Sequence, residues 1–78
     1  MGFKELDTVV LNRELQEHNL RKGDLGAVVQ VYGPDCFEVE FVTASGRTQA
    51  LVTLSAADVR RVGDDDVVAV RTVARGAA

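Results

Sequence analysis

Two glutamates, Glu38 and Glu40, are the side chains in this sequence whose spacing best suits chemistry. They lie in the segment CFEVEFV, residues 36–42, where they alternate with apolar residues. An extended strand places both carboxylates on one face about 6.5–7 Å apart, which would suit acid–base attack on a bond. The sequence offers no pocket or aromatic subsites around them, so we interpret the pair as the solvated face of a half-buried strand. Such an acidic face could attract a basic partner.

The other reactive side chains do not form a catalytic or metal-binding set. His18 could act as a base for Cys36, but nothing in the sequence brings the two together, and no third group would orient them. One cysteine and one histidine cannot supply the usual four ligands of a structural zinc site. The acidic run 64–66 lacks the alternating ligands and closing glutamate of a calcium loop, and the glycines at 23 and 26 lack the Lys-Ser/Thr of a phosphate-binding loop. We therefore expect no enzyme activity, no cofactor and no metal.

Basic residues at the expected loop tips suggest an alternative partner. Arg21, Lys22 and Arg47 could contact RNA, as in a KOW-like module that binds RNA or the ribosome. These cations are interspersed with acids, however. Of the aromatic residues on the predicted strands, Phe37 and Phe41 are expected in the core, which leaves Tyr32 as the exposed ring. A platform for single-stranded nucleic acid needs several exposed aromatic rings on a positive groove. We therefore disfavour nucleic acid and keep RNA binding as the alternative.

Short strands separated by turns must position these side chains. Apolar alternation and β-branched residues predict strands over residues 7–11, 26–32, 36–42, 47–54 and 59–62. Residues 12–24 predict a long polar loop with one helical turn near 13–17, held to the core by Leu15 and Leu20. Ser55 and Asp58 have the spacing of a capping box and predict a helical turn just before the fifth strand.

This order of elements predicts an all-β fold, a small SH3-like barrel of five to six short strands with one short helical turn before strand five. The OB-fold is the competing barrel, but it usually has a helix where only four residues separate Val42 from Arg47 here. We expect one domain over residues 1–78, with a core of about 6–62 and a frayed tail at 74–78. Residues 63–73, which include the apolar stretch VVAV, either complete the barrel as an extra strand, pair with a second copy in a homodimer, or present an edge to a partner.

The composition fits a small globular domain. The chain has 78 residues, 46% of them hydrophobic, and a net charge of −3, which is not the basic excess of a typical nucleic-acid-binding protein. No stretch approaches the ~18 apolar residues of a membrane span, and the N-terminus lacks the apolar core of a signal peptide. A single cysteine fits a reducing compartment. We expect a cytoplasmic protein with no membrane contact.

Longer segments of the sequence resemble known families. LRKGDLGAVVQVYG, residues 20–33, is similar to the KOW motif of ribosomal proteins and elongation factors, and to other SH3-like barrels. The order of FKELDTVVL, HNLRKGDLGAVVQVYG, FEVEFV and GRTQALVTLSAADVR, from Phe3 to about Arg61, resembles a bacterial family of small uncharacterised proteins, a domain of unknown function numbered in the 4900s. This resemblance implies an SH3-like barrel with no established activity, encoded beside toxin-like partners.

The sequence therefore predicts a non-enzymatic protein-interaction module, antitoxin-like or an accessory subunit, that binds one basic protein partner. Electrostatic steering would bring the partner in, and exposed apolar groups such as Tyr32 and Val42 would then pack against it. The residues that we expect to contact the partner are Glu38, Glu40, Tyr32, Glu14, Glu17 and His18.

Overall fold

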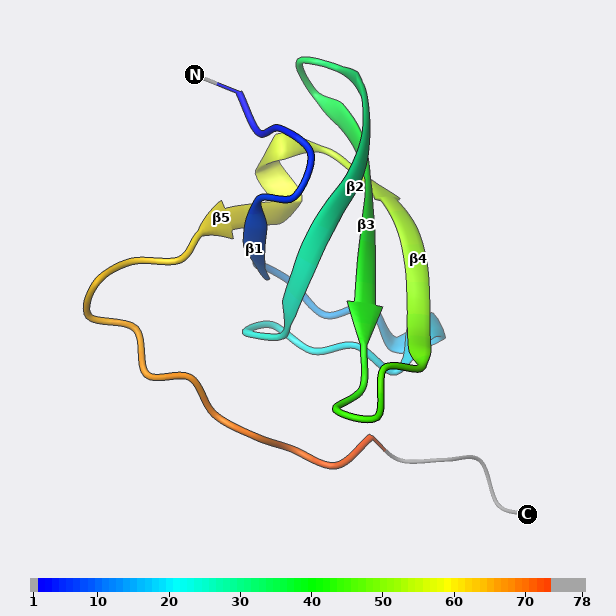
Figure 1. Ribbon diagram of the computed structural model, residues 1–78, viewed down its shortest axis with the longest axis vertical. Helices are drawn as coiled ribbons and strands as arrows, with labels where there is room; N and C mark the ends of the chain where they lie inside the picture. Colours follow the sequence, from blue (N-terminus) through cyan, green and yellow to red (C-terminus); the bar gives the residue numbers. More distant parts are fainter. Residues whose placement is uncertain (1, 74–78) are drawn as a thin grey trace.

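The computed structural model describes residues 2–73. Within this range the chain forms five strands and two single 3₁₀ turns, in the order β1 (Thr8–Leu11), η1 (Gln16–His18), β2 (Leu25–Gly33), β3 (Cys36–Val42), β4 (Thr48–Leu54), η2 (Ala56–Asp58) and β5 (Val59–Arg61). All strand pairs are antiparallel, and the spatial order is β4-β3-β2-β1-β5 (Figure 1). The predicted all-β class, with a helical turn before the fifth strand, is confirmed.

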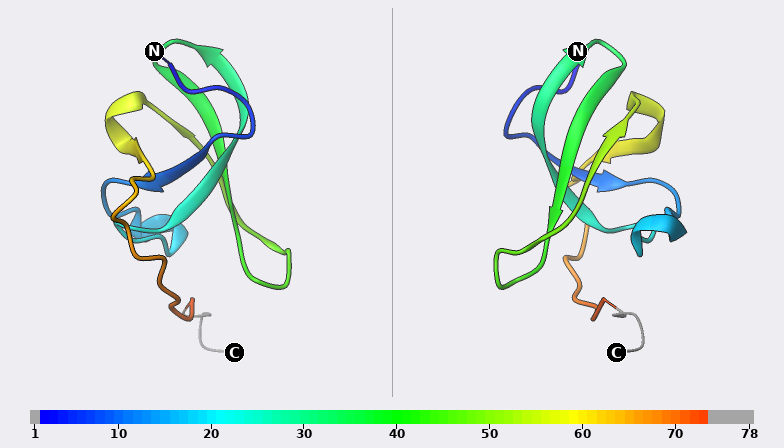
Figure 2. Two further views of the ribbon diagram at one scale, coloured as in Figure 1. Left: turned by 60° about the vertical axis from the view of Figure 1, so that its left-hand side comes forward. Right: turned by 90° about the vertical axis from the view of Figure 1, so that its right-hand side faces the viewer.

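The sheet curls into a small SH3-like barrel around one apolar core. In Figure 2, β1 and β5 run across the direction of β3 and β4, so that the two ends of the sheet face each other across the core. The predicted alternation of β3 is confirmed, because Phe37, Val39 and Phe41 are buried inside. Val9 and Val28 meet them from β1 and β2. Burial of these side chains is the main driving force for folding so short a chain.

The long loop between β1 and β2 is closed by a pair of leucines. Leu15 and Leu20 exchange backbone hydrogen bonds of 3.0 and 3.1 Å, and both side chains are buried in the core. Asn19 adopts the left-handed conformation, with a φ of 57°, which lets the chain turn back sharply. The five-residue spacing of these leucines therefore closes a tight loop, and its helical turn, η1, begins three residues later than the turn predicted near 13–17.

The turn before β5 is capped as predicted. The Asp58 carboxylate accepts hydrogen bonds from the Ser55 amide at 3.0 Å and from the Ser55 hydroxyl at 3.2 Å. Arg13, from the long loop, forms an ion pair with the same carboxylate at 2.9 Å. The start of β5 is thereby tied to the loop that follows β1.

The apolar stretch after β5 does not form the sixth strand that 63–73 could have added. Residues 62–73, which we call the strap, run along the outside of the barrel without strand pairing in the described part of the chain (Figure 1). Two Arg60–Asp66 hydrogen bonds of 2.8 and 3.0 Å turn the chain away from β5, and Arg71 pairs with Asp24. Val67, Val68 and Val70 of the strap remain 70–97% exposed. The expected frayed tail at 74–78 lies outside the described residues.

Gly26 provides a direct test of how closely β2 packs on β3. A Cβ at this position would lie 2.6 Å from Val39 Cγ1 and 2.8 Å from Phe41 Cε2, both in buried side chains. We expect Gly26→Ala to lower the free energy of unfolding by about 1–3 kcal/mol, because overpacking forces core side chains off their rotamers. Urea denaturation measures the change. Gly33→Ala is the matched control, since its Cβ would have no neighbour within 4 Å, and equal stability of the two variants would contradict this packing.

The Arg71–Asp24 pair is expected to hold the strap against the barrel. Burial opposes ionisation of Asp24, but hydrogen bonds from Arg71 and from the Arg21 amide outweigh it, so the pKa of Asp24 lies below its usual range. Asp24→Asn keeps an acceptor for the Arg21 amide and removes the charge. We expect trypsin to cleave after Arg71 about two- to fivefold faster in this variant, since a partly exposed ion pair is worth ~0.5–1 kcal/mol. Asp64→Asn is the control with the same charge change, and equal cleavage rates in both variants would show that the pair does not hold the strap.

Candidate partner-binding surface

The outer face of β3 carries the two predicted carboxylates. Because Phe37, Val39 and Phe41 fill the core, Glu38 and Glu40 project from the opposite face, and both are half-buried. The register places Thr53 of β4 opposite Glu38 and Leu51 opposite Glu40. We call the following residues the acidic face: Tyr32, Glu38, Glu40, Thr48, Leu51 and Thr53.

Uncharged donors hold both carboxylates. The Tyr32 hydroxyl donates to Glu38 Oε1 at 3.1 Å, and the Thr53 hydroxyl donates to the same oxygen at 2.9 Å. The Thr48 hydroxyl donates to Glu40 Oε2 at 2.5 Å. Hydrogen bonds from hydroxyl groups orient a carboxylate but leave its full negative charge in place. Both carboxylates are thus fixed and still able to attract a cation.

The ion pairs of residues 2–73 all use aspartates. Their members are Arg13–Asp58, Arg60–Asp66, Arg61–Asp7 and Arg71–Asp24. Each of these aspartates also accepts a hydrogen bond from the backbone amide three residues before it, at distances between 2.6 and 3.0 Å. None of the glutamates in this range forms an ion pair with an arginine or lysine side chain. The negative charge left for an external cation is therefore carried largely by glutamates.

The long loop supplies the second half of the predicted surface. The Glu14 carboxylate accepts a 3.0 Å hydrogen bond from the Lys22 amide, and Glu17 is exposed in η1. The His18 carbonyl oxygen accepts a 3.3 Å hydrogen bond from Gln49, the neighbour of Thr48 along β4. The loop therefore adjoins the lower end of β4, next to the acidic face but not within it (Figure 1).

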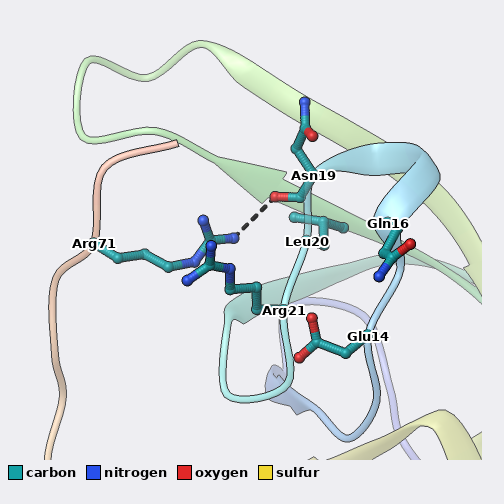
Figure 3. A pocket seen from close by; sticks show the side chains of 6 residues that line it. All are labelled: Glu14, Gln16, Asn19, Leu20, Arg21 and Arg71. Carbon is teal, nitrogen blue, oxygen red and sulfur yellow. Dashed lines mark hydrogen bonds between the residues drawn. The ribbon is translucent and has the colours of Figure 1, made fainter. Parts of the chain in front are cut away.

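A polar hollow separates this loop from the strap. It has a volume of about 520 Å³, and Figure 3 shows Arg71 reaching into it from the strap and Arg21 lying beside it. Arg71 donates to the Asn19 carbonyl oxygen at 2.9 Å, as well as pairing with Asp24. Its guanidinium is thus already engaged, and the hollow serves to anchor the strap.

The structure does not assemble the other reactive groups. Cys36 is exposed at the start of β3, beside the β2–β3 turn, whereas η1, which contains His18, lies at the opposite end of the barrel (Figure 1). Of the acidic run 64–66, Asp66 is committed to Arg60. Hydrogen bonds from Arg60 and from the Gly63 amide lower the pKa of Asp66 to about 2. Within residues 2–73, no three metal-ligating side chains come together.

The sequence matches a family described as a domain of unknown function, DUF4926, over residues 5–61. The chain belongs to this family. The DUF4926 match covers β1 to β5 and includes Glu38 and Glu40, and the strap follows after its last residue. No curated protein and no solved structure matches the chain. None of the helical turns within residues 2–73 has the length and apolar character that a membrane-spanning helix needs.

The sequence analysis did not predict the β4 residues of the acidic face. Thr48, Leu51 and Thr53 complete the acidic face, but they join it only through the β3–β4 register. The signal was the short hairpin loop after Val42, which brings β4 back beside β3. A bulge between Phe41 and Val42 shifts that register, so the loop length alone does not give the partners.

The Tyr32–Glu38 hydrogen bond can be tested through the pKa of Tyr32. This bond, helped by partial burial, raises the pKa of Tyr32, because donation to a carboxylate stabilises the neutral phenol. We expect Glu38→Gln to lower the pKa of Tyr32 toward its ordinary value of about 10. Tyr32 is the one tyrosine of the chain, so the absorbance of its tyrosinate reports on it alone.

Glu40→Gln is the matched control for this titration, because Glu40 bonds to Thr48 and not to the phenol. It should leave the pKa of Tyr32 as in the wild type. Circular dichroism over the same pH range is the check that both variants stay folded during the titration. An unchanged pKa of Tyr32 in Glu38→Gln would contradict the arrangement described for this face.

Proposed function

We propose that this chain is a non-enzymatic protein-interaction module that binds one basic protein partner through the acidic face. The observation that carries the proposal is that Glu38 and Glu40 are held by hydrogen bonds but are not neutralised by a cation of the described range. Each is oriented by hydroxyl groups, and neither has a cationic partner among residues 2–73. A fixed, half-buried and uncompensated carboxylate pair is suited to receive lysine or arginine side chains.

Binding on this surface would proceed in two stages. The negative potential around Glu38 and Glu40, extended by Glu14 and Glu17 of the neighbouring loop, would steer a basic protein toward the acidic face. Exposed apolar groups would then pack against it. Tyr32 and Leu51 are 58% and 53% exposed and flank the two carboxylates. An aromatic ring with a charged rim is a common composition for the centre of a protein interface.

The same face argues for a protein partner over RNA. Tyr32 would be the base-stacking residue, but its hydroxyl is bonded to Glu38, so a phosphate backbone nearby would meet negative charge. The concrete form of the proposal is an antitoxin-like or accessory subunit in the bacterial cytoplasm. The exposed single thiol of Cys36 is compatible with that reducing compartment.

A capture experiment with matched variants tests this function. We expect immobilised wild-type protein to retain a basic protein from nuclease-treated lysate of the parent organism at low salt, and to release it as ionic strength rises. The double variant Glu38→Gln/Glu40→Gln should retain at least tenfold less of that protein, because two charge-assisted contacts are lost.

The control double variant, Asp64→Asn/Asp65→Asn, changes the net charge equally at residues that form no ion pair within 2–73, and it should behave as the wild type. Equal retention by all three proteins would overturn the role of the acidic face. Retention of RNA in untreated lysate, with no basic protein captured, would favour the KOW-like alternative.

A further inference from the structure

The sheet has one unprotected edge. β4 is the last strand on its side and pairs with β3 alone. From Ala50 to Leu54, its other edge takes part in no backbone hydrogen bond with any residue of the described range 2–73. η1 lies beside the lower end of the strand, near Gln49, and leaves the upper part uncovered (Figure 1). A row of free amides and carbonyls is a template for another strand.

The opposite edge of the sheet, formed by β5, is protected against further strand pairing. β5 has only three residues, and two of them are arginines. Arg60 donates to the backbone carbonyl oxygen of Arg61 at 3.0 Å, so a side chain already uses a main-chain acceptor there. β4 has seven residues, TQALVTL, with no charge and no proline. Proteins usually blunt exposed edges with charges, prolines or short strands, and β4 has none of these.

The two carboxylates of the acidic face lean toward this open edge. Thr53 and Thr48 belong to β4, and their hydroxyls donate to Glu38 and Glu40 from the side of that strand, while Tyr32 donates to Glu38 from β2. The carboxylates stand two residues apart on β3, so their spacing matches the repeat of side chains on one face of a strand. Between them and the open edge lie Leu51 and Thr53, both exposed.

We propose that the partner binds by strand addition: an extended segment with lysine or arginine at alternate positions pairs with Ala50–Leu54 of β4 as a sixth strand. This inference rests on the proposed function and specifies its geometry. Neighbouring strands lie about 4.8 Å apart, so the added strand would run roughly 10 Å from β3. The long stem of a lysine or arginine can cross β4 over Leu51 or Thr53 and bring its charge to Glu38 or Glu40.

Strand addition assigns separate tasks to the backbone and the side chains. Main-chain hydrogen bonds to β4 would select an extended conformation, while the carboxylates would select cations at alternate positions. A segment with the same charge in a helical conformation would not satisfy both conditions. The surface therefore distinguishes partners by sequence pattern as well as by net charge.

Charge identifies the occupant as a basic partner and not the strap of a second copy. The strap is extended and lacks strand pairing, but its apolar stretch 67–70 carries no cation for the acidic face. Arg60 and Arg71 hold the strap at the side of its own barrel. The acidic face would gain no neutralisation from the valines of this stretch.

Three synthetic peptides of seven residues test the inference on the intact chain. The first alternates lysine and valine, the second has the same composition with the lysines in one block, and the third is the alternating peptide with N-methyl groups on every second amide. We expect fluorescence anisotropy to show binding of the alternating peptide, with affinity at least tenfold lower for the other two.

Protein variants test the role of the two carboxylates. The alternating peptide should lose the same affinity with Glu38→Gln/Glu40→Gln, but not with Asp64→Asn/Asp65→Asn. Hydrogen exchange of the amides from Ala50 to Leu54 should slow when the alternating peptide is added.

The outcomes separate this inference from the proposed function. Equal binding of the alternating and N-methylated peptides would overturn strand addition while leaving the acidic face as a binding surface. Failure of every peptide to bind, with a basic protein still captured from lysate, would also overturn it. Failure of both experiments would overturn the proposed function itself. Slow exchange of the β4 amides without peptide, together with dimers in sedimentation, would assign the edge to a second copy and overturn the basic occupant.

Discussion

The alternation of side chains along β3 is the constraint on which the rest of this structure depends. β3 lies between β2 and β4, and its three inward residues fill the centre of the core. Gly26 lets β2 approach because it presents no Cβ to Val39 and Phe41. With the inward face fixed by packing, Glu38 and Glu40 must lie outside. Their position on the surface is thus a consequence of core packing.

Aspartate and glutamate have different tasks in this small domain. A short aspartate side chain can accept a backbone amide three residues earlier, which closes a turn, and can bind an arginine with its remaining capacity. Asp7, Asp24 and Asp58 do both, and their arginines come from 45 to 54 residues away in the chain. Glu38 and Glu40 are held by side-chain hydroxyls instead. Within residues 2–73, the carboxylates without an ion pair are therefore the five glutamates together with Asp35, Asp64 and Asp65.

The sequence was sufficient for the parts that depend on local pattern. Period-two alternation located β3 to the residue, and the Ser55–Asp58 spacing located the turn before β5. Other features depended on tertiary context. The helical turn of the long loop shifted because Leu15 and Leu20 pair with each other, and 66–73 stayed out of the sheet although its valines favour strands. Arg60 and Arg71 tether this segment through aspartates that no periodicity reveals.

Among residues 2–73, the strap and the outer edge of β4 both lack strand partners, and two ion pairs tether the strap to β5 and to the long loop. An extended apolar segment and an uncharged edge strand on one chain would ordinarily pair within the molecule or between copies. The low pKa of Asp66 means that its pair with Arg60 is fully present above pH 3.8 and is lost as the pH falls toward 2. At neutral pH the strap is thus held at the side of the barrel by charge. Under the proposed function, the edge next to Glu38 and Glu40 would stay free for a partner that brings its own cations, and the ion pairs that position the strap would then also preserve the specificity of the acidic face.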